Sequence, residues 1–193
     1  GLSGVSGHIV LSTGTASKGN SGAIYLGSGA ATSGRGGSVY VSVGSGNSAT
    51  GGQLILSAGD SSGGSAGSGG SIEVGTGYSS TTSSGDFTLS TPNAGTSGVS
   101  GMISVSTGTT SNGNSGALHL ETGVASSGRS GSITLSVGDG NSGSGGQMVF
   151  SAGDTLTADG TSGGAISITS GKSALTRSGH IVVMTADGGA PSR

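Results

Sequence analysis

Apolar side chains alternate with other residues in short runs, and these runs recur at regular intervals along the whole chain. A glycine precedes each run, and the second and fourth residues after it are apolar, as in the run GHIVL that begins at Gly7. Apolar residues at every second position are typical of a β-strand with one buried face. The pattern therefore predicts one short strand in each repeat unit, with the second and fourth positions facing inward.

Twelve glycines mark the starts of these repeat units, and positions are numbered from them below. These anchor glycines are Gly7, Gly22, Gly37, Gly52, Gly70, Gly85, Gly101, Gly116, Gly131, Gly146, Gly164 and Gly179. The second position is held by Ile9, Ile24, Val39, Leu54, Ile72, Phe87, Ile103, Leu118, Ile133, Met148, Ile166 and Ile181. The fourth is held by Leu11, Leu26, Val41, Leu56, Val74, Leu89, Val105, Leu120, Leu135, Phe150, Ile168 and Val183.

The intervals between successive anchor glycines are 15, 15, 15, 18, 15 and 16, and the same order then begins again. Residues 95–188 align with residues 1–94 without a gap, which indicates an internal duplication. Self-similar units too short for a helix pair or a propeller blade are typical of a solenoid, in which stacked units bury a shared apolar face. We therefore expect an all-β fold, a single-domain β-solenoid (β-helix) over 1–193 with about 12 coils of ~15 residues. It would comprise superrepeats 1–94 and 95–188 and a C-terminal end, 189–193, with no cysteine available for disulfides.

The remaining positions of each unit complete the expected coil. The sixth position is small or β-branched, as in Thr13 and Val43, and is expected to share the inward face. A glycine follows at the seventh position in ten of the twelve units, which predicts a turn there. The ninth position is mostly Ala, Gly or Ser and suits a second, closely packed wall, whose outward side chains would be those of the eighth and tenth positions.

Composition narrows the possible partners. Glycine accounts for 46 residues, charged residues for only 7%, and the formal net charge is -2. A disordered Gly/Ser linker is one interpretation of such a chain, but a linker has no need of β-branched residues at fixed spacing. The chain has no basic cluster, so nucleic acid is not an expected partner, and it has no run of about 18 apolar residues, so membrane insertion is not expected.

Catalytic and metal chemistry find little support in the sequence. His8 and His180 share the first position of their units and His119 the third, with no nucleophile or carboxylate cluster nearby, so we expect no enzyme and no cofactor. Asp60, Asp139 and Asp154 raise the alternative of calcium binding. Calcium-binding repeats need carboxylates in successive turns to surround the ion, and here only some units have them, so we expect no metal site.

Three segments of the chain carry a likeness to known proteins: GGSVYVSVGSG, GGQLILSAGD and SGSITLSVGDG. Their short Gly/Ser-rich units resemble the β-solenoid repeats of large secreted proteins of microalgae and some bacteria, and those of antifreeze (ice-binding) proteins of polar green microalgae. This resemblance implies a secreted protein that adsorbs to ice or ordered surface water.

The candidate ice-binding face is the expected wall of eighth and tenth positions. A flat face of short Thr, Ser, Ala and Asn side chains can order water, and a low charge favours this because strongly hydrated ions disrupt an ordered layer. The candidate residues are Thr15, Ser17, Ala30, Thr32, Ser45, Asn47, Ser62, Ser80, Thr109, Ser111, Ser126 and Asn141. Of the repeated pair Thr13 and Thr15, only Thr15 is expected to point outward.

The alternative function is structural. Neither end of the chain has an obvious polar cap, which favours flanking repeats or end-to-end self-association. The protein would then be a structural or adhesive repeat segment of a larger extracellular filament or surface protein. Ice shaping by the purified protein distinguishes the first function, and concentration-dependent filaments distinguish the second.

Overall fold

The computed structural model describes residues 4, 6–47, 50–62, 67–156 and 162–188. Within these ranges it has no helix and no strand. The expectation of an all-β, single-domain β-solenoid is therefore wrong for the described residues. They form extended chain interrupted by short bends, in two units, Gly1–Gly101 and Met102–Arg193.

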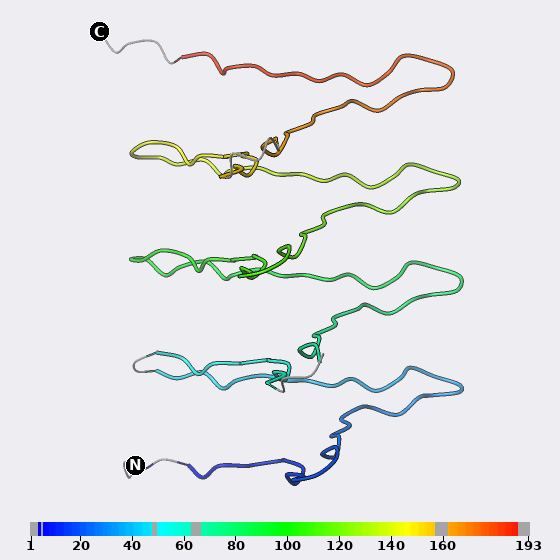
Figure 1. Ribbon diagram of the computed structural model, residues 1–193, viewed down its shortest axis with the longest axis vertical. Coiled ribbons are helices and arrows are strands. Elements are labelled where there is room, and N and C mark those ends of the chain that lie inside the picture. The colour runs from blue at the N-terminus through cyan, green and yellow to red at the C-terminus, as the bar shows by residue number, and fades with distance from the viewer. Residues whose placement is uncertain (1–3, 5, 48–49, 63–66, 157–161, 189–193) are drawn as a thin grey trace. The chain divides into compact units, whose positions relative to one another are not determined.

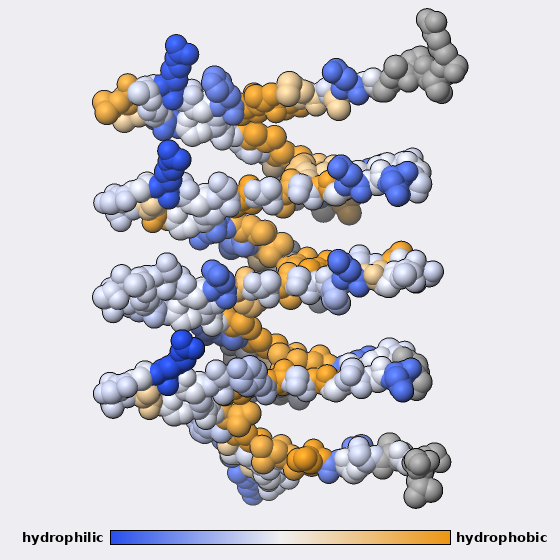
Figure 2. All heavy atoms as spheres, turned by 180° about the vertical axis from the view of Figure 1, so that it is seen from behind, coloured by the Kyte–Doolittle hydropathy of each residue, from blue (hydrophilic) through white to orange (hydrophobic). Residues whose placement is uncertain are grey.

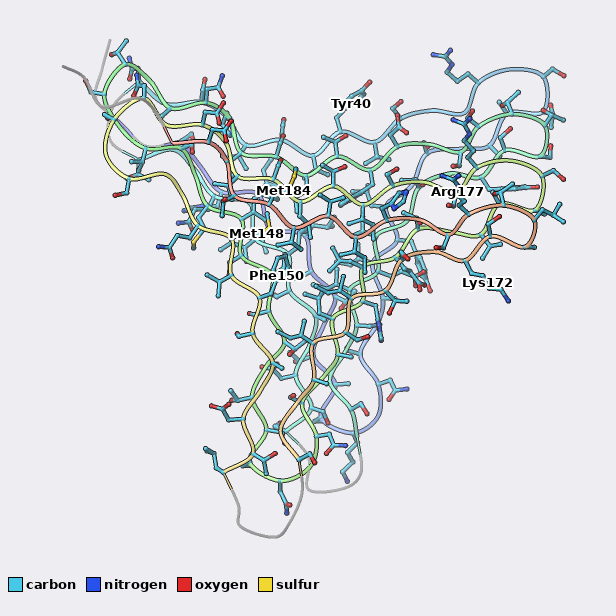
Figure 3. All side chains as sticks on the ribbon, turned by 90° about the horizontal axis from the view of Figure 1, so that it is seen from above. Tyr40, Met148, Phe150, Lys172, Arg177 and Met184 are labelled. Atoms are coloured by element: carbon cyan, nitrogen blue, oxygen red, sulfur yellow. The ribbon has the colours of Figure 1, made fainter. Side chains whose placement is uncertain are left out.

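Each unit consists of arms and connecting segments. We define an arm as the stretch from the sixth position of one repeat unit to the anchor glycine of the next, for example residues 13–22, and a connecting segment as the five residues between arms. The chain runs out along one side of an arm and returns along the other (Figure 1). In the unit that begins at Met102, Met148, Phe150 and Met184 lie near the centre where arms meet, whereas Lys172 and Arg177 lie out on an arm (Figure 3).

The chain reverses direction at bends within the arms. The bends include residues 17–19, 32–34, 47, 80–82, 96–98, 111–113, 126–128, 141–144 and 174–176. All but the bend at 96–98 begin at the tenth position of a repeat unit. The turn expected at the seventh position therefore lies three residues further along, because the sixth and seventh positions are held against the next anchor glycine.

The hydrogen bonds agree with the absence of a sheet among the described residues. Every hydrogen bond between described residues stays within one arm, and the partners farthest apart in sequence are Gly70 N with Gly59 O and Gly164 N with Gly153 O, each pair at 2.9 Å. A β-solenoid requires backbone ladders between successive coils. The bonds between described residues close individual arms and do not join one turn of the chain to the next.

The expected apolar interior is also missing, because no described residue is buried. In several connecting segments, though not in residues 9–11 or 181–183, the alternation nevertheless remains visible in the exposed fractions of the side chains. Ile24, at the second position, is 50% exposed, Tyr25 at the third is 94% exposed, and Leu26 at the fourth is 77% exposed. Apolar residues gather along the connecting segments while the arms are mainly polar (Figure 2). The segments therefore have a preferred apolar side, but the chain leaves it open.

Candidate functional site

Each arm is closed at its base by a contact that we call the neck, between the sixth-position residue and the next anchor glycine. A Cβ placed on any of the eleven anchor glycines from Gly22 to Gly179 would come within 2.6–3.6 Å of the preceding sixth- or seventh-position residue. The distance is 3.3 Å or less, tighter than most real Cβ contacts, at Gly37, Gly52, Gly70, Gly101, Gly146 and Gly164, so close approach favours glycine there. At the other five it is 3.4–3.6 Å, an ordinary van der Waals contact, so the neck accounts for only part of the anchor column.

Hydroxyl groups hold several necks. The Thr13 hydroxyl donates a hydrogen bond of 3.0 Å to Gly22 O, and the Ser28 hydroxyl donates one of 2.7 Å to Gly37 O. Thr91 and Thr122 donate to Gly101 O and Gly131 O at 3.2 and 3.3 Å. At the base of these arms a side-chain hydroxyl therefore donates a hydrogen bond to a backbone carbonyl oxygen, as a backbone N–H does in a sheet.

The necks without a hydroxyl at the sixth position are closed in two other ways. Val43 and Val137 pack tightly on Gly52 and Gly146, where an added Cβ would lie 2.6 Å from a valine Cγ1. The two longer arms, which begin at Ala58 and Ala152, are closed by backbone hydrogen bonds to the oxygens of Gly59 and Gly153. Ala58 and Ala152 are accordingly among the few half-exposed residues.

Serine side chains stabilise the bends of two arms at equivalent places in the duplication. Ser79 Oγ accepts a 3.0 Å hydrogen bond from Thr82 N and lies 2.9 Å from the Thr82 hydroxyl. Ser173 makes the same contacts with Thr176, at 3.0 and 2.9 Å. Such side-chain to backbone bonds are typical of serine in tight turns. The bend geometry of the first superrepeat thus recurs in the second.

All twelve candidate ice-binding residues are exposed and lie on the arms, at most two on any one arm. Seven of them are bend residues: Ser17, Thr32, Asn47, Ser80, Ser111, Ser126 and Asn141. The other five, Thr15, Ala30, Ser45, Ser62 and Thr109, lie in the arms outside the described bends. No side-chain hydrogen bond joins any of the twelve to another described residue. They share positions in the repeat, but the described residues contain no sheet on which they would form one flat face.

The two threonines Thr13 and Thr15, which recur as Thr107 and Thr109, have different surroundings. Thr13 belongs to a neck, and its hydroxyl is used by Gly22 O. Thr15 lies two residues further out on the same arm. The hydroxyl of Thr13 is thus committed to the fold of the arm, and only Thr15 remains a candidate for an outward contact.

The most extensive apolar surface of the described residues is formed by side chains that the sequence pattern predicts to be in the interior of the fold. The apolar side chains at the second and fourth positions, which we call the apolar rows, are all exposed, from 44% for Met148 to 100% for Ile9. Their alternation was the signal, but it indicates only that the two positions share a side. It does not indicate what covers that side.

No group of three or more His, Asp or Glu residues that could hold a metal ion occurs in the part of the chain that the structure describes. Asp60, Asp139 and Asp154 each lie on an arm, at the eighth position of a unit. His8, His119 and His180 lie in connecting segments. The structure also shows no pocket among its described residues.

Among the described residues, no helix has the length and apolar character needed to cross a membrane. Searches for likeness to known proteins found no matching family model, no matching curated protein and no matching solved structure.

Proposed function

We propose that this chain is a structural repeat segment of a larger extracellular assembly. The observation that carries the proposal is the set of exposed apolar rows, which recur in every repeat unit and are covered by no described part of the chain. Large exposed apolar surfaces mark sites of association. A repeat chain whose rows are all exposed is suited to packing against other molecules along its length.

The amount of surface supports an assembling protein. The chain exposes 19509 Å². A compact monomer of this mass exposes roughly 7,900 Å², and the same chain fully unfolded roughly 25,700 Å². A single copy therefore hides only about a quarter of its unfolded surface, too little to offset the conformational entropy of ordering its backbone. Association with further molecules supplies the missing burial.

Electron microscopy of the purified chain over a concentration series tests this function. We expect filaments or other extended, regular assemblies whose number rises with concentration. A homogeneous preparation of separate, compact particles at every concentration would contradict a structural role. Circular dichroism of the same samples would show whether ordering of the backbone accompanies assembly.

Ice binding is a second candidate, favoured by the exposed short side chains that recur at the eighth and tenth positions. Seven of them occupy bends, all twelve are exposed, and most neighbouring residues are uncharged. The test is thermal hysteresis and ice shaping by the wild-type protein and by a variant with Thr15→Lys and Thr109→Lys. Ice activity that the charged variant lacks would support this function. Crystals that grow alike with and without protein would exclude it.

A further inference from the structure

We propose that the partner on the apolar rows is a second copy of this chain, lying alongside the first so that matching connecting segments face one another. The inference rests on the proposed structural function and adds to it the identity of the partner and the side chains that meet. The surface involved is the second and fourth positions of the repeat units.

The excess surface is too large for a small partner. The difference from a compact monomer is roughly 11,600 Å², whereas a standard interface between two proteins buries about 1,600 Å² in total. Only obligate assemblies bury several thousand Å². The occupant must therefore run along much of the length of the chain, which excludes a single docked peptide or a small globular domain.

The spacing of the apolar rows further restricts which partner can cover them. The intervals between rows follow those between the anchor glycines, with one long step in each superrepeat, and this irregular order is repeated once. A partner that covers every row needs apolar residues at the same irregular spacing. A second copy of this chain has that spacing by construction, so copies aligned in register, or shifted by one superrepeat, match row to row.

The low charge of the connecting segments permits two copies of the chain to align side by side. The connecting segments, positions one to five of all twelve units, carry only three charged residues, Glu73, Asp86 and Glu121. Identical copies side by side bring like charges together, and like charges placed directly opposite one another destabilise a pair of strands. With so few charges on the rows, self-association meets little electrostatic opposition.

Glycine at the seventh position supplies a further argument. Gly14, Gly29 and Gly44 have no heavy atom within 4 Å of an added Cβ, and their φ angles lie outside the left-handed region. No contact among the described residues explains why ten of twelve units have glycine there. At the fifth position, by contrast, Gly27 is equally open but corresponds to Glu121 in the second superrepeat, so a side chain is accepted there. Glycine is selected where another backbone approaches closely, and a neighbouring copy provides that backbone.

Sedimentation velocity of the full chain over a range of concentrations is the primary test. We expect species whose masses are whole-number multiples of 17.7 kDa. Replacing apolar row residues in both superrepeats (Ile24→Ser, Leu26→Ser, Leu118→Ser and Leu120→Ser) is expected to weaken association about tenfold or more. The matched control is Tyr25→Ser, which removes a large side chain from the opposite side of the same segment and is expected to leave association unchanged.

A second pair of variants tests the inference without changing the apolar rows. Gly29→Ala is expected to weaken association, whereas Gly27→Ala, two residues away and equally open, is expected to leave it unchanged. A wild-type chain that remains monomeric at all concentrations would overturn the inference, as would equal effects of test and control variants in both pairs.

The outcomes also separate this inference from the proposed function. Regular filaments that form equally well with the row variants would retain the structural function and overturn the pairing of copies through these rows. Discrete oligomers that respond to the variants as expected, but never extend into larger assemblies, would support the pairing and contradict the structural function.

Discussion

Val43 packs on Gly52 so closely that a Cβ added to the glycine would lie 2.6 Å from Val43 Cγ1, and Val137 and Gly146 repeat this relationship in the second unit. Real Cβ atoms essentially never make a contact this short, so an alanine at either glycine forces the neck apart. These two necks are consequently places where the chain tolerates little change.

Gly52→Ala is expected to destabilise its arm by about 1–3 kcal/mol, the usual cost of overpacking. Adding Val43→Ala removes the methyl group that an alanine at 52 would strike and should restore most of the loss. Thermal unfolding of the assembled wild type, the two single variants and the double variant, all at the same protein concentration, measures the coupling. Additive effects of the two substitutions would contradict the neck contact.

The hydroxyl necks make a milder prediction. Thr13→Val keeps the shape of the side chain but removes the hydrogen bond to Gly22 O, and we expect a loss of about 0.5–1.5 kcal/mol in the free energy of unfolding. Thr15→Val, on the same arm, serves as the control and should change stability by less than about 0.5 kcal/mol. Equal losses from the two variants would show that the Thr13 hydroxyl has no special role.

The bends at 80–82 and 174–176 depend on a preceding serine. Ser79→Ala removes the acceptor of the Thr82 N–H, and Ser173→Ala does the same for Thr176. We expect faster amide hydrogen exchange at Thr82 and Thr176, measured by NMR, with little change elsewhere. Ser80→Ala, next to Ser79 and itself a candidate ice-binding residue, should leave these amides unchanged.

Two glycines adopt a left-handed backbone at the ends of equivalent bends, Gly19 with φ 96° and Gly113 with φ 113°. Alanine at either position should cost about 1 kcal/mol, because a Cβ is disfavoured in this region. Gly128 ends the bend at 126–128 without a left-handed φ and has open space around it. Gly128→Ala is therefore the control, and differential scanning calorimetry of the three variants should place it nearest the wild type.

Salt dependence distinguishes apolar association from electrostatic association. The rows carry few charges, so raising sodium chloride to about 0.5 M should leave the assembled fraction nearly constant, although it shortens the Debye length to a few Å. Ammonium sulfate should raise that fraction, because excluded salts strengthen apolar burial. Sedimentation in both salts measures this, and dissociation in sodium chloride would indicate ionic contacts.

The sequence predicts which features recur along the chain better than it predicts which residues contact one another. The duplication recurs in the structure, since Ser79–Thr82 and Ser173–Thr176 have the same geometry at equivalent places in the two superrepeats. Alternation recurs in some connecting segments, since Tyr25 and Tyr40 are each more exposed than their neighbours, but it does not recur in residues 9–11 or 181–183. The contact between Val43 and Gly52 was not predicted, because a small inward residue and a distant glycine give no sign of being paired.

For the candidate ice-binding residues, too, the sequence predicted their positions in the repeat but not which parts of the backbone pair beneath them. The sequence indicated short polar side chains at the eighth and tenth positions, and the structure places those residues, such as Thr15 and Ser17, in exposed arms. The flat wall expected beneath them does not occur among the described residues. A flat wall needs ladders between turns of the chain, and side-chain periodicity carries no information about which backbone groups pair.

The sequence by itself determined the repeat unit, its duplication and the side of each segment on which apolar residues lie, because alternation is a property of extended backbone alone. Only the tertiary structure decided that a sixth- or seventh-position residue closes an arm on the next anchor glycine and that most of the described bends lie three residues beyond the expected turn. It also decided that the apolar rows remain open. The physical reason is that short hydroxyl and backbone hydrogen bonds within an arm are satisfied locally, whereas burial of the rows requires surface from outside the arm.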